Sequence, residues 1–308
     1  MNNTCAVVVT YNRLDMLRQC VAALEKQTAA CDILVIDNAS TDGTHDWLST
    51  HEYIINIRMT ENTGGAGGFN KGMREATERG YRYIWVMDDD TIPNADALEK
   101  LLEADGILKG NYGWLSCVPL WKDGKICVIN KQKVYGSYFD DIQVLKHGLL
   151  RAIHATFVGL FVRRETVLKV GLPIKEFFIW GDDIEYTRRI SVRMKMPCYV
   201  VGQSIVTHAM KDNTGGNIAV DVPERLKRYN LAFRNENYLF RQEGLKGFCY
   251  YFAKCGKYIV LSLTKGKGHR LKRTGIVIKQ FFAGLFFNPK IEYVSDDTET
   301  TAKHSYGP

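Results

Sequence analysis

Short apolar runs alternate with stretches of helical spacing over the first 90 residues of the chain. Runs of Val, Ile and aromatic residues predict strands, whereas leucines three or four positions apart predict helices. Strands are expected at 5–10, 32–37, 53–59 and 81–87, and helices at 14–27, from 44 onward and at 69–79. Such alternation builds a mostly parallel sheet flanked by helices. We therefore expect an α/β fold.

Each predicted strand ends in a polar cluster. In open α/β sheets, ligands bind beyond the carboxyl ends of the strands. Parallel strands end at the same edge, so we expect these clusters to line one rim of the sheet. The clusters are Tyr11-Asn12-Arg13, Asp37-Asn38, Asn62-Thr63-Gly64-Gly65 and Asp88-Asp89-Asp90.

The three consecutive aspartates that follow the predicted strand at 81–87 are the most informative of these clusters. Successive strand residues point to opposite faces, so Asp88 and Asp90 can point the same way. Two carboxylates side by side suit Mg²⁺ or Mn²⁺, ions that are often shared with a substrate phosphate. Taken alone, the run also fits an acidic turn before a helix. Its place on the rim favours the metal site, with Asp89 facing the sugar or the protein interior.

Residues 62–72 form a glycine-rich segment. Glycines let backbone N–H groups approach a diphosphate closely, and a following helix N-terminus favours the negative charge. A purely structural loop is the alternative. A nicotinamide-binding fingerprint is disfavoured, because it would follow the first strand rather than the third. Asn62 and Gly65 are therefore candidates for contact with a nucleotide.

Three further positions add chemistry to the rim. Asp37 can accept a hydrogen bond from an imide N–H of uracil or thymine, or it can cap a helix. Asp182 and Asp183 follow an aromatic run at 177–180, and burial beside aromatic rings raises a carboxyl pKa and makes a better base. They can also cap the helix that follows. His208 follows a predicted strand and is either a ligand for Mn²⁺ or an ordinary polar residue.

The second half of the chain is less regular. Further strands are expected near 114–120, 125–134, 155–162 and 198–206, with a short helix near 183–192. We place the catalytic domain at 1–222, followed by a helical, basic and aromatic region at 223–290. Residues 291–308 are polar and are expected to form a flexible tail.

Positive charge is concentrated near the C-terminus. Residues 225–290 hold 15 Lys/Arg and two Asp/Glu, a local net charge of +13, whereas the whole chain carries +7. The rest of the chain is therefore net negative. A basic segment mixed with aromatic residues predicts an amphipathic surface that lies on an anionic membrane. A helical subdomain with solvated lysines is the alternative.

The chain shows neither a basic leader followed by an apolar stretch nor 18 uninterrupted apolar residues. Its eight cysteines include no pair with CxxC spacing, which disfavours zinc and thioredoxin-type sites. We expect a cytoplasmic protein with reduced cysteines, peripheral on the inner face of the cell membrane.

Taken in order along the chain, these motifs resemble family 2 glycosyltransferases, whose GT-A fold is Rossmann-like. The resemblance covers about residues 4–240 and is strongest to the galactofuranosyl and rhamnosyl branch. Its motifs are Val8-Val9-Thr10-Tyr11-Asn12-Arg13, Val35 to Thr44, Asn62-Thr63-Gly64-Gly65, the three aspartates, Trp180-Gly181-Asp182-Asp183, and the late His208.

The resemblance implies a role for each candidate residue. Asp88, Asp90 and His208 would bind a divalent metal, Mn²⁺ or Mg²⁺, and Asp183 would be the catalytic base. The residues implied for the nucleotide are Thr10, Arg13, Asp37, Asn62 and Gly65. Those implied for the donor sugar are Asp89, Trp180 and Asp182. Asp182 stands where a glutamate is common elsewhere in the family, which leaves the choice of sugar open.

The function expected from this resemblance is inverting sugar transfer in cell-surface polysaccharide synthesis. The favoured donor is UDP-galactofuranose, and the acceptor is a glycan or lipid-linked glycan. A rhamnosyltransferase that uses dTDP-rhamnose is the first alternative. A nucleotidyltransferase is the second, although it would carry a basic glycine loop near the first strand. A nucleic-acid-binding module is disfavoured, because clustered carboxylates repel phosphates.

Overall fold

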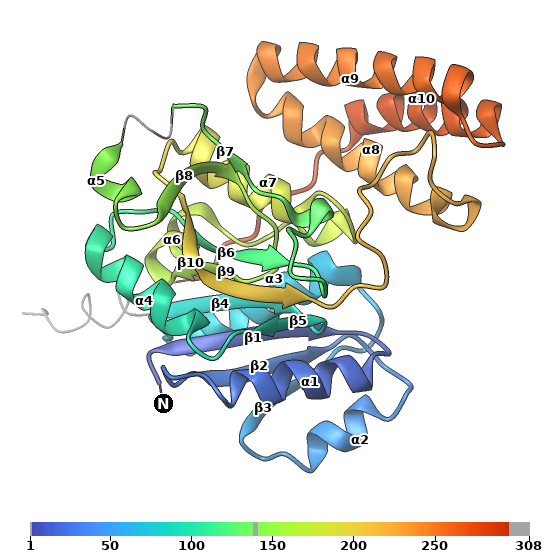
Figure 1. Ribbon diagram of the computed structural model, residues 1–308. Helices are drawn as coiled ribbons and strands as arrows, with labels where there is room; N and C mark the ends of the chain where they lie inside the picture. The colour runs from blue at the N-terminus through green and yellow to red at the C-terminus, as the bar shows by residue number, and fades with distance from the viewer. Residues whose placement is uncertain (1, 138–140, 296–308) are drawn as a thin grey trace, which may run out of the picture.

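The computed structural model describes residues 2–137 and 141–295 and contains a twisted sheet flanked by helices (Figure 1). Within these ranges the strand order is β3-β2-β1-β4-β9-β6-β10-β8-β7, and β5 pairs with β10 outside this path. The strands are β1 Thr4–Thr10, β2 Asp32–Asp37, β3 Ile54–Arg58, β4 Tyr83–Asp88, β5 Thr91–Pro93, β6 Leu115–Leu120, β7 Lys133–Val134, β8 Leu149–His154, β9 Leu160–Arg163 and β10 Tyr199–His208.

Helices cover both faces of the sheet, and three more extend from one end of the molecule (Figure 1). Short 3₁₀ turns lie at 128–130, 175–177 and 223–225, and a π-helical turn at 189–193 follows α7. The α-helices are α1 Leu14–Leu24, α2 Thr44–Ser49, α3 Gly64–Glu78, α4 Ala97–Leu108, α5 Ile142–Leu145, α6 Arg164–Val170, α7 Asp182–Arg188, α8 Leu226–Arg241, α9 Gly244–Lys265 and α10 Arg270–Phe286.

Strand β1 lies between β2 and β4, is parallel to both, and is buried along its whole length. Its side chains alternate between two hydrophobic cores, as the pleat of a strand requires. Ala6 and Val8 belong to the core beneath α1 and α4, and Val7 and Val9 belong to the core beneath α3. The predicted parallel β1–β4 unit is therefore confirmed, and its four strand ends lie at one edge.

Beyond β4 the sheet is mixed, because β9 runs antiparallel between β4 and β6, and β8 runs antiparallel to β10. The strand predicted at 125–134 is mostly wrong. Ile126 and Val128 are about half exposed, and only Lys133 and Val134 pair as β7. The sequence reasoning also did not find β5, β8, α4 or α6.

The glycine-rich segment is mainly helical, which corrects the prediction of a loop before a helix at 69. Helix α3 begins at Gly64. A Cβ atom on Gly68 would lie 2.4 Å from Val9, and one on Gly72 would lie 2.3 Å from Val7. These two glycines are four positions apart on one helix face, so they let α3 lie close against β1. Their role is packing rather than contact with a diphosphate.

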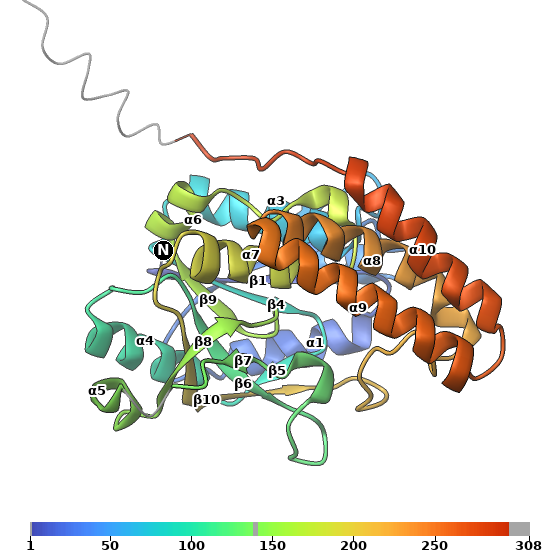
Figure 2. The same cartoon turned by 90° about the horizontal axis from the view of Figure 1, so that it is seen from above.

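The predicted helical region near the C-terminus is present as α8, α9 and α10. The three helices pack around a core of their own that includes Tyr229, Phe233, Tyr251 and Val277. Figure 2 shows α9 and α10 side by side at the outer edge of the molecule, and Figure 1 shows α8 between them and the sheet domain. Within the described ranges, no helix is both long and apolar enough to cross a membrane.

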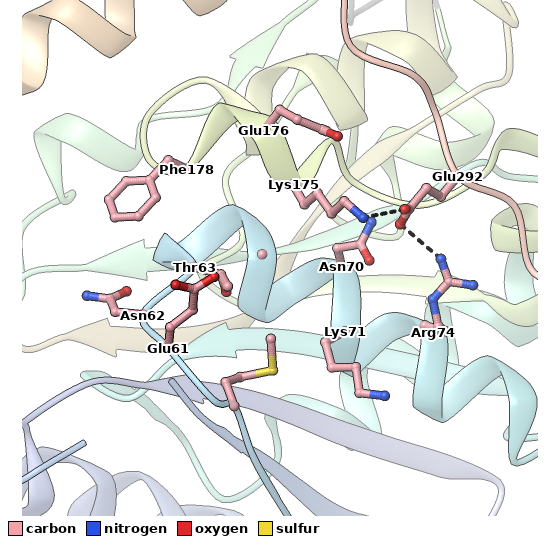
Figure 3. Close-up of a pocket in the computed structure, with 12 residues that line it drawn as sticks. Glu61, Asn62, Thr63, Asn70, Lys71, Arg74, Lys175, Glu176, Phe178 and Glu292 are labelled. Atoms are coloured by element: carbon pink, nitrogen blue, oxygen red, sulfur yellow. Dashed lines mark hydrogen bonds and ion pairs between the residues drawn. The ribbon is translucent and has the colours of Figure 1, made fainter. Parts of the chain in front are cut away.

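The first residues of the predicted tail contact the sheet domain. Glu292 accepts hydrogen bonds from Arg74 at 3.0 Å and from Lys175 at 2.5 Å, as Figure 3 shows. Val294 is buried in the core beneath α3. Residues 291–295 are therefore packed against the sheet domain, so the prediction of a flexible tail is wrong for its first five residues. The remainder of that tail, 296–308, lies outside the described residues.

Candidate active site

A cavity of about 1260 Å³ opens at the rim where β1, β4 and β10 end. Except for Asp37, every site residue proposed from the sequence lines this cavity. Its walls also include side chains of α7, α8 and α9, so the sheet domain and the C-terminal helices share one site. The predicted residues that line it are Thr10, Arg13, Asn62, Gly65, Asp88, Asp89, Asp90, Trp180, Asp182, Asp183 and His208.

Asp88, Asp90 and His208 form a cluster whose three possible ligand atoms lie within 4.8 Å of one another. Asp88 ends β4, Asp90 lies two residues further on, and His208 is the last residue of β10. The Nδ1 atom of His208 lies 2.7 Å from Oδ1 of Asn130, and its Nε2 atom lies 2.9 Å from Oδ1 of Asp90. Asn130 therefore orients the imidazole, as an outer partner of a metal ligand does. Two carboxylates and an imidazole fit Mn²⁺.

Burial and mutual charge perturb this cluster strongly. Burial, together with the charge of Asp90, raises the pKa of Asp88 to about 7. For Asp90 burial acts in the same direction, but the bond to His208 and the charge of Arg13 outweigh it and lower the pKa to about 2. Burial alone would lower the pKa of His208, yet the bond to Asp90 raises it to about 10. Such opposed shifts are typical of functional sites.

Asp89 points into the protein, which is one of the two orientations expected for it. It accepts hydrogen bonds from the Thr10 hydroxyl at 2.8 Å and from Arg13 at 3.1 Å. Arg13 also donates to Asp90 at 2.6 Å. One arginine thus holds two neighbouring carboxylates, and the hydroxyl of Thr10 is engaged by Asp89.

Asp182 and Asp183 occupy the first turn of α7 and enter the cavity beside Trp180. Burial raises the pKa of Asp183 to about 6, although its Oδ1 accepts the N–H of Ile184 at 2.7 Å. Burial and the neighbouring Asp183 raise the pKa of Asp182 well above its usual value. With a pKa of about 6, Asp183 is ionised at neutral pH and is a better base than an ordinary aspartate. Asp182 is the harder of the two to ionise, because burial and the neighbouring Asp183 both raise its pKa.

The loop before α7 has a strained backbone. Phe178 and Trp180 have positive φ angles of 62° and 65°, a conformation that costs about 1–3 kcal/mol for such residues. Asn235 of α8 is fully buried, and its amide donates to the carbonyls of Phe177, Ile179 and Trp180. The indole of Trp180 packs edge-on against the ring of Tyr229 of α8, with the two ring centroids 5.0 Å apart. The C-terminal helices thus hold the loop that carries the aspartate pair.

The N-terminus of α3 supports the same loop from the other side. The N–H of Ala66 donates to the carbonyl of Phe178 at 3.1 Å. A Cβ atom on Gly64 would lie 2.0 Å from that carbonyl oxygen, and Gly64 has a φ of +71°. Only glycine fits a site this close with that backbone. Gly64 therefore permits direct contact between α3 and the strained loop.

Asp37 is fully buried and does not reach the cavity. Its Oδ1 accepts the N–H of Ser40 at 2.9 Å, whereas its Oδ2 has no hydrogen-bond partner and lies 3.7 Å from Arg58. Its neighbour Asn38 does line the cavity and donates to Asn62 and to the carbonyl of Gly64. Asn38 therefore fixes the segment that leads into α3.

Several lining residues were not found from the sequence. Asn130 lies in a segment predicted as a strand, and Asn235 lies in the predicted helical region at 223–290. Lys133, His154 and Arg188 line the far side of the cavity. No motif marked these three residues, because contacts across the fold bring them to the cavity.

Known glycosyltransferases resemble this chain in sequence and in fold. The profile of the family described as Glycosyl transferase family 2 matches residues 5–106. Galactofuranosyltransferase GlfT1 of Mycolicibacterium smegmatis is 27% identical over 264 residues, which cover 79% of this chain and 84% of that protein. The dTDP-rhamnosyl transferase RfbF of Shigella flexneri is 27% identical over 261 residues, or 78% of this chain and 81% of that protein.

Among solved structures, GalNAc-T7 with UDP, GalNAc and Mn²⁺ matches with a TM-score of 0.65 at 13% identity. The match covers 92% of this chain and 56% of that chain. It shows a shared fold. The chain therefore carries a domain that matches family 2 glycosyltransferases at residues 5–106, and its fold is that of GT-A glycosyltransferases.

Proposed function

We propose that this protein is a metal-dependent, inverting glycosyltransferase that moves galactofuranose from UDP-galactofuranose to a hydroxyl of a glycan or lipid-linked glycan in cell-surface polysaccharide synthesis. The observation that carries the proposal is that the Asp88, Asp90 and His208 cluster shares one cavity with Asp183. The choice of galactofuranose rests on the similarity to GlfT1, which extends over most of both chains.

Asp88, Asp90 and His208 would hold the metal ion. An imidazole among the ligands favours Mn²⁺ over Mg²⁺, which prefers oxygen ligands alone. The bound ion supplies positive charge that stabilises the departing nucleoside diphosphate. Arg13, which contacts Asp89 and Asp90, adds a second positive charge at the same end of the cavity.

Asp183 is the proposed general base. It takes the proton of the acceptor hydroxyl as that oxygen bonds to the anomeric carbon from the face opposite the diphosphate. The bond from the carbon to the phosphate oxygen breaks, and its electron pair leaves with the nucleoside diphosphate. A single displacement inverts the anomeric centre. The raised pKa of about 6 supports this role, because such a base is ionised at neutral pH yet accepts a proton readily.

The remaining candidates would bind the donor. Asp37 is buried at the end of β2 outside the cavity, and its Oδ2 makes no hydrogen bond, so a local shift of the Asp37-Asn38 segment would be needed for it to accept the imide N–H of a uracil ring. Thr10 and Arg13 lie at the end of the neighbouring strand, and Asn62 and Gly65 lie at the start of α3. Trp180, Asp182 and Asp89 are proposed to surround the donor sugar.

A donor panel tests the proposal. UDP-galactofuranose, UDP-galactopyranose and dTDP-rhamnose are compared with Mn²⁺ by thermal stabilisation and by slow donor hydrolysis. We expect the largest effect with UDP-galactofuranose; a ligand at 100 times its Kd stabilises a protein by about 2.7 kcal/mol. The Asp88→Asn variant is the control and should lose the part of the stabilisation and of the donor hydrolysis that depends on Mn²⁺. The absence of any response to all three donors would contradict the proposal.

Rhamnose transfer is the second candidate, because RfbF, named as a dTDP-rhamnosyl transferase, also has 27% identity to this chain, over 261 residues. Both donors carry a diphosphate, so the metal cluster does not separate them. A stronger response to dTDP-rhamnose in the same panel would select this alternative.

We also propose that the protein acts on the inner face of the cell membrane and binds anionic lipid through α9 and α10. Exposed apolar side chains recur at helical spacing along both helices, including Leu245, Phe252 and Leu263 on α9 and Leu271 and Phe282 on α10. Exposed lysines lie beside them, as on amphipathic helices at membrane surfaces.

Flotation with anionic liposomes tests this surface. We expect salt-sensitive binding, since each basic residue near the lipid contributes about 1 kcal/mol. The paired change Phe252→Ser and Leu271→Ser should weaken binding, whereas Tyr53→Ser, an exposed aromatic position beside β3, is the control. Binding that is absent, or insensitive to the paired change, would contradict the membrane surface.

A further inference from the structure

The cavity continues past the carboxylates into a basic arm. We use this name for the part that lies between the β7–β8 hairpin and helices α8 and α9. Aromatic residues of the two helices, among them Tyr250 and Tyr258, form part of its wall. The basic residues that line the arm are Lys133, Arg188, Lys227, Arg228, Lys246 and Lys254.

Two of these cations are neutralised within the arm. Arg188 pairs with Glu243 at 2.6 Å, and Lys254 pairs with Glu236 at 2.7 Å. Among the described residues, Lys133, Lys227, Arg228 and Lys246 make no ion pair. These uncompensated positive charges repel one another across the cavity. An arm of this kind is complementary to an anion.

His154 lies within the influence of three of the cations that line the arm, Arg188, Lys133 and Lys254. It is cross-strand neighbour to Lys133 in the β7–β8 pair. Its Nδ1 atom is buried, faces no hydrogen-bond partner, and belongs to a side chain that lines the cavity. Burial, with the charges of Arg188, Lys133 and Lys254, lowers the pKa of His154 to about 4. The imidazole is therefore neutral, and the field around it is positive.

The diphosphate of the donor does not account for this arm, because the proposed metal cluster and Arg13 serve it at the other end of the cavity. On the basis of the proposed function, we propose that the basic arm binds a phosphate group carried by the acceptor. The acceptor sugar would then extend from the phosphate toward Asp183. Lys133 and Lys246 would contact the phosphate as exposed cations on opposite walls, and His154 would offer a further polar atom.

The placement of α9 favours a phosphate attached to a lipid. Lys246, Tyr250 and Lys254 of this helix face the cavity, while Leu245 and Phe252 of the same helix are exposed to solvent. A phosphate in the arm would therefore lie beside an apolar helix face. An alkyl chain attached to that phosphate can leave the cavity along this face.

Calorimetric titration of the full chain, with UDP and Mn²⁺ present in excess, tests the arm. Octyl phosphate, octyl glucoside and inorganic phosphate are the probes. We expect octyl phosphate to bind and octyl glucoside not to bind. The double change Lys133→Gln and Lys246→Gln should weaken the binding of octyl phosphate by about tenfold or more, since hydrogen bonds to charged groups are strong. Lys257→Gln, an exposed lysine of α9 outside the cavity, is the matched control.

Each outcome bears on the proposal. Inorganic phosphate that binds as tightly as octyl phosphate supports the phosphate site with a water-soluble acceptor, whereas tighter octyl phosphate supports a lipid-borne one. Equal binding of octyl glucoside and octyl phosphate, or an unchanged double variant, overturns the proposal. UDP binding is measured first. Its absence would count against the proposed function, and the phosphate titration would then be scored on its own.

Discussion

The two ends of the cavity are built in different ways. At the acidic end, Asp89, Asp90 and His208 are buried, and hydrogen bonds between strand ends fix them in place. In the basic arm, Lys133 and Lys246 are exposed and come from a short hairpin and a helix. The sheet therefore preorganises the groups proposed for chemistry. The exposed lysines add positive charge, which can attract an anionic acceptor without holding it in one fixed position.

The largest effect is expected at the acidic end. Asp183→Asn should lower kcat by about 10²–10⁴-fold, the usual contribution of a general base, while donor binding changes little. Asp182→Asn is the comparison, because burial and the neighbouring Asp183 raise the pKa of Asp182 and make it the weaker candidate for an ionised base. A smaller loss is expected there. Steady-state transfer assays check both variants, and near-normal turnover by Asp183→Asn would remove it from this role.

Metal removal should have the next largest effect. A chelator should abolish transfer, and added Mn²⁺ should restore it. His208→Ala should raise the Mn²⁺ concentration for half-maximal activity by about tenfold or more, because even outer-shell changes weaken metal sites by 10–100-fold. His154→Ala, at the other end of the cavity, should leave that concentration unchanged. Transfer activity measured against Mn²⁺ concentration distinguishes the two histidines. An equal rise in the Mn²⁺ requirement of both variants would refute the assignment of the metal site to the end of the cavity that holds His208.

Asn235→Ala tests how the helices control the acidic end. The change removes the donor to three carbonyls of the strained loop, so we expect about a tenfold loss of kcat and a stability loss of about 1–3 kcal/mol. Asn237→Ala is the matched control, since its amide nitrogen donates to the carbonyl of Phe281 in α10 and its oxygen accepts from Arg241, both outside the strained loop. Both should be destabilised. Only Asn235→Ala should lose more activity than its stability explains, and equal activity in the two variants would contradict this role.

The smallest effect concerns pH. Since Asp183 must be ionised to act, kcat/KM should fall as pH drops through about 6, the pKa that burial gives it. A raised pKa means that the folded state binds the proton more readily, so this group does not unfold the protein there. Asp90 acts in the opposite sense, because its pKa is lowered to about 2 in the folded protein. The ionised carboxylate stabilises the fold above about pH 4, the ordinary pKa of an aspartate, and this stabilisation is lost as the pH falls below that value. A melting temperature that falls in parallel with activity near pH 6 would count against Asp183.

Sequence reasoning was reliable where one local pattern fixes both structure and position. The alternation of strands and helices placed β1 to β4 and brought Asp88, Asp90, Asp183 and His208 to one cavity. It failed for the glycines of α3, because a glycine that permits close packing looks the same as one that binds a phosphate. It also failed near 125–134, where apolar residues remain exposed and form a 3₁₀ turn.

The succession of β1 to β4 along the chain and the residues at their carboxyl ends were determined by the sequence alone, because hydrophobic periodicity is a local property. Only the tertiary structure decided which charges are neutralised and which remain free. Asn130 meets His208, and Asn235 meets the loop before Asp183, across long separations in the chain. Lys133 of β7 and Lys246 of α9 are far apart in the chain, and the fold brings both to the wall of one cavity. Such contacts depend on burial and packing, which no local pattern encodes.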